Sequence, residues 1–252
     1  GIPATKSHDG AAAADPDGVV PRALRAMRAA APSLPIITDV CLCGFTDHGH
    51  CGLICNGEIL NDASLERMAR IACVHAAAGA DLVAPSGMLD GGVGAIRAAL
   101  DRAGHGHVGI LAYTVKYASA WYGPFREALD SSPRFGDRRS HQMDVANGDE
   151  ALEEARLDLE EGADILMVKP ALPALDVVRR LRERFTGVPI AAYQVSGEYA
   201  SIVAAGERGW LDADTAAREA LVSIARAGAD IIVTYFAERV ARWLRDVEGA
   251  TA

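Results

Sequence analysis

Two lysines directly follow apolar runs of the kind that form buried strands. Only three of the 25 basic residues are lysines, Lys6, Lys116 and Lys169, so arginine supplies most of the positive charge. Lys116 follows the run 108–115, and Lys169 follows the run 165–168. A lysine that is buried beside another cation loses its proton more readily, and the neutral amine can form a Schiff base with a carbonyl compound. We therefore predict that Lys116 and Lys169 are nucleophiles rather than solvated surface groups.

Three cysteines form a second group of residues that could bind a metal or react. Cys41 and Cys43 point to the same side of an extended segment, and a glycine-containing loop can bring Cys51 back to them. Three thiolates suit Zn²⁺ and leave its fourth position open, as a catalytic zinc requires. His48 or His50 could instead complete the site, which would then be structural. A disulfide is the alternative for any two of the cysteines.

The other two cysteines have simpler interpretations. Cys55 lies just beyond the group and is interpreted as a bystander thiol, and Cys73 lies on the apolar stripe of a predicted helix. Five cysteines without an export signal favour reduced thiols and a cytoplasmic location.

A long segment rich in glycine, proline and aromatic residues follows Lys116. It contains Tyr122-Gly-Pro-Phe-Arg126 and, further on, 131–139 with three arginines. Long loops after barrel strands often act as lids, and arginine binds carboxylates in a bidentate manner. We predict a lid over about residues 116–142, although loop arginines are usually solvated.

A repeated phrase indicates the elements that position these groups. Gly-Ala-Asp followed by an apolar run occurs at 79–86, 162–169 and 228–235, each time after a helical stretch. The glycine suits the residue that ends a helix with positive φ, and the apolar run is typical of a strand buried in a parallel sheet. The phrase therefore predicts successive βα units.

Three more strands of this type are predicted at 35–41, 108–115 and 188–195, with a small hairpin at 53–60. Six strands are fewer than the eight of a closed (β/α)8 TIM barrel. We predict one α/β domain over 1–252, a TIM-type barrel of six βα units whose first strands are missing. Catalytic groups cluster at the carboxyl ends of barrel strands. The further residues at those ends are Asp39, Ser86, Ser196 and Tyr235.

The composition excludes several classes of protein. Of 252 residues, 50% are hydrophobic and 23% are charged, which excludes a disordered, collagenous or coiled-coil chain. No apolar run is long enough for a membrane helix. The formal net charge of −9, without a basic block, argues against a nucleic-acid or membrane partner.

Several long phrases resemble the porphobilinogen synthase (5-aminolevulinate dehydratase) family over nearly the whole chain. They are Thr38-Asp-Val-Cys-Leu-Cys, His48-Gly-His-Cys-Gly, Tyr122-Gly-Pro-Phe-Arg126, Phe135-Gly-Asp-Arg-Arg139, Met167-Val-Lys-Pro170 and Val195-Ser-Gly-Glu198. The resemblance implies a lyase that joins two 5-aminolevulinate molecules into porphobilinogen, with loss of two waters, in heme and tetrapyrrole biosynthesis.

The resemblance also implies roles for individual residues. Lys169 would hold the first substrate as a Schiff base, and Lys116 would hold the second. Cys41, Cys43 and Cys51 match the zinc-dependent branch. The implied substrate contacts are Asp39 and Ser86 for amino groups, Ser196 and Tyr235 for the first carboxylate, and Arg126, Arg138 and Gln142 for the second, with Tyr122 and Phe125 in the lid.

This chain also departs from the family pattern. It begins at a segment that resembles the loop after the second strand, and it has Gly87 and Gly92 where the family usually has a carboxylate and a guanidinium. The family's homo-octamer and its allosteric Mg²⁺ are therefore not assumed. Two alternatives stay open: a catalytically silent zinc-binding fragment of the family, and a class I aldolase-like enzyme with one Schiff-base lysine.

Overall fold

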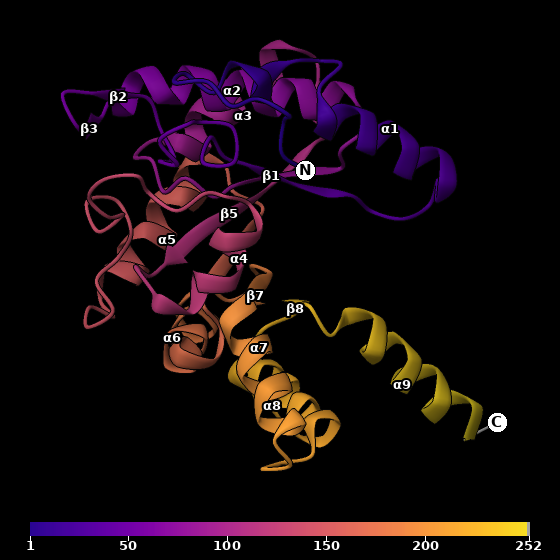
Figure 1. Ribbon diagram of the computed structural model, residues 1–252. Coiled ribbons are helices and arrows are strands. Elements are labelled where there is room, and N and C mark those ends of the chain that lie inside the picture. The colour runs from indigo at the N-terminus through magenta and orange to yellow at the C-terminus, as the bar shows by residue number, and fades with distance from the viewer. Residues whose placement is uncertain (251–252) are drawn as a thin grey trace. The chain divides into compact units, whose positions relative to one another are not determined.

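The computed structural model describes residues 1–250, with side chains to residue 245. The chain folds into two compact units, which are described separately. Unit 1 comprises Gly1–Ala118 and Arg126–Leu166, and unit 2 comprises Ser119–Phe125 and the chain from Met167 onward. Figure 1 labels the elements of both units.

Unit 1 contains strands that alternate with helices. Its elements are η1 (Ala11–Ala14), α1 (Val19–Ala30), β1 (Ile37–Val40), β2 (Ile54–Cys55), β3 (Glu58–Ile59), α2 (Asn61–Ala77), β4 (Leu82–Pro85), α3 (Gly92–Arg102), β5 (Gly109–Lys116) and α5 (Glu150–Glu161). The helix α4 (Gly123–Ala128) begins in unit 2 and ends in unit 1. β1 pairs in parallel with β4, and β4 with β5, whereas β2 and β3 form the predicted hairpin.

The core of unit 1 lies between its strands and the helices α2 and α3, which pack against each other (Figure 1). Val40, Val83 and Ile110 supply the strand side of this core. Ile71 and Ile96 supply the helix side, and all five side chains are fully buried. Because side chains alternate along β1, Thr38 and Val40 face the helices while Asp39 faces the other way.

Unit 2 continues the same pattern. Its elements are η2 (Ala120–Tyr122), η3 (Leu172–Ala174), α6 (Leu175–Arg184), β7 (Ile190–Gln194), α7 (Ser196–Glu207), α8 (Ala213–Ala227), β8 (Ile231–Thr234) and α9 (Ala237–Ala250). β6 (Ile165–Lys169) starts in unit 1 and continues in unit 2. β7 and β8 are parallel, and α8 packs against α6 and α7.

The repeated Gly-Ala-Asp phrase has one structural role at all three places. Each aspartate accepts a hydrogen bond from the backbone N–H at the start of the neighbouring strand: Asp81 from Ile36 (2.7 Å), Asp164 from Ile110 (2.8 Å) and Asp230 from Ile190 (2.9 Å). The preceding glycines have φ between 104° and 126°, which only glycine adopts readily. The phrase therefore ends a helix and fixes the register of the next strand.

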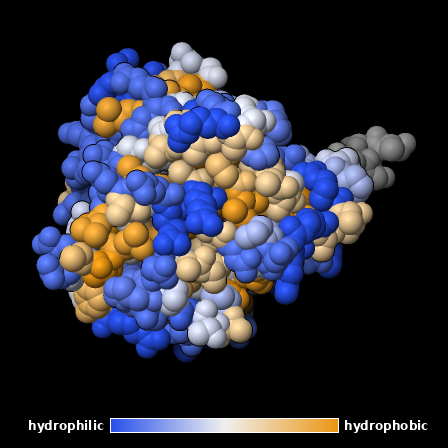
Figure 2. Space-filling model, turned by 90° about the horizontal axis from the view of Figure 1, so that it is seen from above, coloured by the Kyte–Doolittle hydropathy of each residue, from blue (hydrophilic) through white to orange (hydrophobic). Residues whose placement is uncertain are grey.

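The sequence predictions agree with these elements. The six predicted strands are present in the order β1-β4-β5-β6-β7-β8, which confirms the α/β fold. The structure adds α3, α7 and the short α4, which the sequence patterns did not delimit. No helix in the described chain has the length and hydropathy to span a membrane. On the face seen in Figure 2, apolar residues lie in small groups between hydrophilic ones.

Candidate active site

The three predicted metal-binding cysteines lie together in unit 1. Cys41 and Cys43 directly follow β1, and Cys51 returns to them on the loop 44–52. All three are buried, and their sulfur atoms lie within 4.8 Å of one another. The Sγ atoms of Cys41 and Cys43 are 3.4 Å apart. The sequence therefore predicted this cluster correctly as a spatial group.

The cluster has the chemistry of a zinc site. Two thiolates on a tetrahedral zinc with bonds of about 2.3 Å are about 3.8 Å apart, so small movements would admit the ion. All five cysteines are free thiols, and no disulfide competes with metal binding. The pKa of Cys51 is well below its usual value, because Cys41 and Cys43 donate hydrogen bonds to its sulfur and Arg138 and Lys116 add positive charge. The donor set therefore fits Zn²⁺.

The other candidate ligands lie outside this cluster. His48 Nε2 is 3.1 Å from the carbonyl oxygen of His8, and His50 Nε2 is 3.0 Å from that of Phe135. Burial lowers the pKa of both histidines. Cys55 is exposed, and Cys73 packs against the core of unit 1. Within the described chain, the group therefore consists of cysteines alone.

Lys116 lies at the end of β5, in the same unit as the cysteines. It is buried, and its Nζ donates a hydrogen bond of 2.5 Å to the carbonyl oxygen of Ser86. Ser86 is itself fixed by its backbone N–H, which donates to Val40. The Tyr113 ring centroid lies 5.4 Å from the Lys116 Nζ. Lys116 is thus held at a strand end, as predicted, and Ser86 is brought to it.

The predicted carboxylate-binding residues of unit 1 have different environments. Arg138 is buried, and its Nη2 donates to the carbonyl oxygens of Gly49 (2.7 Å) and Ser131 (2.6 Å). Burial lowers the pKa of Arg138, but Cys51 and the other two sulfurs more than offset this, so the pKa is raised overall. Arg126 is only half-buried.

Gln142 is buried and comes near Lys116 through the backbone. The next residue, Met143, donates its N–H to the carbonyl oxygen of Lys116 (3.0 Å). Neither the amide oxygen nor the amide nitrogen of Gln142 has a hydrogen-bond partner among the described residues. Buried polar groups are normally satisfied. Gln142 is therefore equipped to bind a polar ligand.

His141 is a candidate that the sequence reasoning missed. Its Nε2 is buried without a hydrogen-bond partner among the described residues. Burial, together with the charges of Lys116 and Arg138, lowers its pKa to about 4. The only available signal was its position beside Gln142, because a lone histidine in a loop has no pattern of its own.

Lys169 lies in unit 2, at the end of β6, and its surroundings are aromatic. Its Nζ lies 4.3 Å from the ring centroid of Tyr193, 5.2 Å from that of Tyr122 and 5.5 Å from that of Phe125. The Tyr122 hydroxyl donates to the carbonyl oxygen of Lys169 (3.1 Å). The first part of the predicted lid therefore covers this lysine.

Ser196 and Tyr235 also belong to unit 2. Ser196, at the start of α7, is buried and accepts a hydrogen bond from the Phe125 N–H (3.1 Å). Tyr235 follows β8 and is 45% exposed, with its ring 5.6 Å from that of Tyr199. Ser196 therefore contacts the lid segment beside Lys169, whereas Tyr235 is open to solvent.

Glu198 has a positioning role that the sequence did not indicate. It is buried, and its two oxygens accept hydrogen bonds from Leu172 N–H (2.7 Å) and Val195 N–H (2.6 Å). Burial raises its pKa above the usual value. Glu198 thus joins the loop after Lys169 to the start of the helix that carries Ser196.

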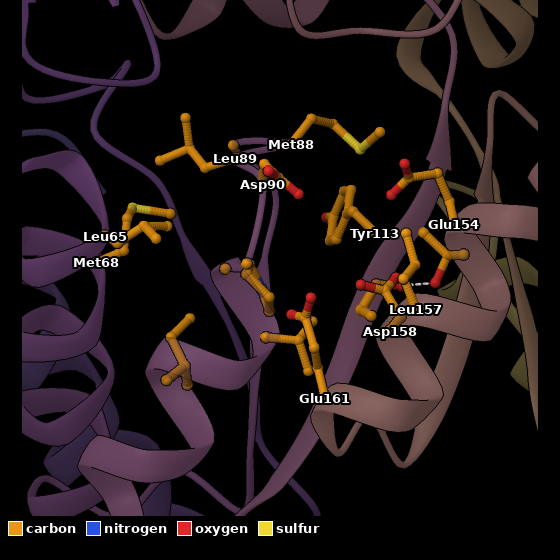
Figure 3. Close-up of a pocket in the computed structure, with 18 of the residues that line it drawn as sticks. Leu65, Met68, Met88, Leu89, Asp90, Tyr113, Glu154, Leu157, Asp158 and Glu161 are labelled. Carbon is orange, nitrogen blue, oxygen red and sulfur yellow. Dashed lines mark hydrogen bonds between the residues drawn. The ribbon is translucent and has the colours of Figure 1, made fainter. Parts of the chain in front are cut away.

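A cavity of about 190 Å³ in unit 1 contains neither lysine. Figure 3 shows Asp90 on one side and Glu154, Asp158 and Glu161, all from α5, on another. Burial is the main cause that raises the pKa of Asp158 to about 7. The cavity is therefore acidic, and it shares Tyr113 and His141 with the surroundings of Lys116.

These features define a class of protein: an α/β enzyme with a buried lysine at the end of a strand in each unit and a cluster of three thiols in one of them. The model of the family described as delta-aminolevulinic acid dehydratase matches residues 1–243. The chain belongs to this family.

Individual relatives agree with this assignment. The chain is 56% identical over 246 residues to delta-aminolevulinic acid dehydratase of Halalkalibacterium halodurans, covering 98% of this chain and 75% of that protein. It is 58% identical over 237 residues to the enzyme of Methanothermobacter thermautotrophicus, covering 94% and 72%. A crystal structure of the Toxoplasma gondii enzyme, in complex with the reaction product porphobilinogen, matches with a TM-score of 0.95 and 45% identity, covering 98% of this chain and 71% of that one.

Proposed function

We propose that this chain is a porphobilinogen synthase, a lyase that condenses two molecules of 5-aminolevulinate into porphobilinogen and releases two waters. The observation that carries the proposal is the buried lysine at the carboxyl end of a strand in each unit, Lys116 and Lys169. An aldolase-like enzyme with one Schiff-base lysine would leave the second lysine and the thiol centre without a role.

Lys169 binds the first substrate in this proposal. Its amine attacks the ketone carbon, and the oxygen leaves as water to give the Schiff base. The rings of Tyr122, Phe125 and Tyr193 exclude water that would reverse this step. Ser196 and Tyr235 supply hydroxyl groups for the carboxylate.

Lys116 binds the second substrate in the same manner. Arg126, Arg138 and Gln142 receive its carboxylate, and the unpartnered amide of Gln142 supports this role. Asp39 and Ser86 receive the substrate amino groups. The neutral His141 is available to accept a proton near Lys116.

Cys41, Cys43 and Cys51 would hold Zn²⁺, with the fourth position open. When bound, the ion would polarise a substrate oxygen or lower the pKa of a water.

Several finer expectations accompany this proposal. An eight-stranded barrel, first strands outside this chain, a single domain with a lid over 116–142, a cytoplasmic location and a homo-oligomer all stay predictions. The strand order supports the barrel, and the contacts of Tyr122 and Phe125 with Lys169 support a lid in the first part of this range.

Trapping with borohydride tests the proposal. The protein is incubated with 5-aminolevulinate and borohydride, and the adducts are located by mass spectrometry, while pyrrole formation is followed by colour reaction. We expect adducts on Lys169 and Lys116, and none on Lys6, which serves as an internal control. Unmodified lysines in a folded protein would exclude the function, and bound zinc without any adduct or pyrrole would favour the silent fragment.

A further inference from the structure

In unit 1, part of the lid contacts the loop that carries Cys51, and groups of both segments take part in the hydrogen bonds. We define the lid segment as residues 129–138 and the cysteine loop as residues 44–52. The Arg134 N–H donates to the carbonyl oxygen of His48 (3.0 Å), and the His50 ring meets the carbonyl oxygen of Phe135 (3.0 Å). The two segments therefore share hydrogen bonds just before Cys51.

Gly49 allows this close approach. It has φ of +75°, and a Cβ built on it would lie 2.5 Å from the carbonyl oxygen of Ser132. A side chain at position 49 would therefore both strain the loop and push the lid segment away. The cysteine loop is shaped to receive the lid segment.

Arg138 holds both segments with one nitrogen atom. Its Nη2 donates to Gly49 in the cysteine loop and to Ser131 in the lid segment, at 2.7 and 2.6 Å. A buried guanidinium needs a compensating negative charge. The sulfurs of the thiol cluster, that of Cys51 most, stabilise the guanidinium. Through Gly49, two residues before Cys51, Arg138 therefore ties the lid segment to the loop that carries the third thiol.

Lys6 fixes the first residues of the lid segment. Its Nζ donates to the carbonyl oxygens of Leu129 (3.0 Å) and Asp130. This accounts for the third lysine of the chain, which the catalytic proposal does not use. The lid segment is thus attached at its start, by Lys6 at residues 129–130 and by Arg138 at residue 131, and again at residues 134–135 by the cysteine loop.

We propose that Arg138 is a positioning residue that couples metal retention in the cysteine cluster to closure of the lid segment. A zinc ion with three thiolates carries a net charge of −1, which the Arg138 guanidinium balances. Opening the lid segment removes this cation and the donor on Gly49, so the metal is released faster. Conversely, a bound metal fixes Cys51 and, with it, the nearby Gly49 carbonyl that accepts from Arg138. Removing the metal therefore loosens this contact, and the lid segment opens. The inference rests on the metal site of the proposed function, but not on the condensation reaction.

The first test measures zinc release and uses a matched pair of arginines. Arg139 is the neighbour of Arg138 but is exposed, and its ion pair among the described residues is with Asp137. Zinc-loaded wild type, R138K, R138M and R139M are mixed with a chromogenic chelator. We expect release to be roughly tenfold to a hundredfold faster in R138M than in R139M, and intermediate in R138K, which retains the charge but not the reach and planar geometry of the guanidinium. Equal release rates in R138M and R139M would overturn the proposal.

The second test needs no variant, so it holds even if R138M does not fold. Hydrogen exchange of residues 129–138 is followed by mass spectrometry in the wild type with zinc and after chelation. We expect zinc to slow exchange in this segment at least several-fold, while the peptide of α8 stays unchanged. Equal hydrogen-exchange rates in the lid segment with zinc and after chelation would overturn the coupling. Neither readout involves 5-aminolevulinate, so a failure of the condensation activity would be seen separately.

Discussion

The two buried lysines have very different surroundings. Lys116, in unit 1, shares its region with three thiols, the buried Arg138 and the polar side chains of His141 and Gln142. Lys169, in unit 2, lies among aromatic rings. The same side chain is thus placed once among charged groups and thiols and once among aromatic rings. In the proposed function, two identical substrate molecules can therefore be treated differently without any difference in the lysine itself.

Removing either lysine should have the largest effect. We expect K169M and K116M each to lose at least roughly a thousandfold in kcat, because the nucleophile is gone. Each variant should still form a borohydride-trapped adduct at its remaining lysine. Loss of both adducts from one substitution would show that the two regions do not act separately.

Removing the metal site should affect only one region. We expect C51S to bind no stoichiometric zinc and to lose roughly a hundredfold or more in product formation, because one of three thiolates is missing. Adduct formation at Lys169 should be unchanged. C73S is the control, since Cys73 packs against the core outside the cluster. A slow Lys169 adduct in C51S would contradict the comparison.

The aromatic surroundings of Lys169 should contribute a smaller effect. Replacing the nearest ring, in Y193L, admits water and removes a cation–π contact of roughly 1–2 kcal/mol that would stabilise the cationic Schiff base. We expect adduct formation at Lys169 to slow about threefold to thirtyfold, measured by single-turnover trapping. Y193F retains the ring and should stay near wild type. Y113L, at the longer Lys116 contact, should change its adduct rate less.

The charged character of unit 1 should also make its stability depend on pH. Asp158 has a folded-state pKa of about 7, above its ordinary value of 3.8, mainly because of burial. Its contribution is therefore complete below about pH 4 and is lost as the pH rises towards 7, by up to about 1.4 kcal/mol per pH unit. We expect D158N to gain stability relative to wild type over this range, measured by urea unfolding. A constant difference between pH 4 and 8 would argue against a buried protonated carboxyl.

Much of this arrangement could be predicted from local sequence signals. The Gly-Ala-Asp phrase predicted the strands, and strand ends predicted where Lys116 and Lys169 lie. The spacing of Cys41, Cys43 and Cys51 predicted their cluster. These predictions succeeded because each depends on a short segment whose backbone geometry is set by its own residues.

Other features could not be predicted in this way. Glu198 binds two N–H groups that come from different loops, and Arg138 binds carbonyl oxygens 89 and 7 residues away. Backbone groups have no residue identity, so the sequence carries no signal of such pairings. Hydrogen bonds between a side chain and distant backbone groups could therefore be identified only in the folded structure.

The aspartates of the Gly-Ala-Asp phrases determine more than the register of the strands. Asp164 fixes where β6 begins against Ile110, five residues before Lys169. Side chains alternate along a strand, so a slip by one residue would turn this amine to the opposite face of the sheet. The carboxylate of Asp164, which lies outside the proposed substrate contacts, thus determines on which face of the sheet the Lys169 amine lies. We expect a substitution of Asp164 to lower activity by misplacing Lys169, although the amine itself is retained.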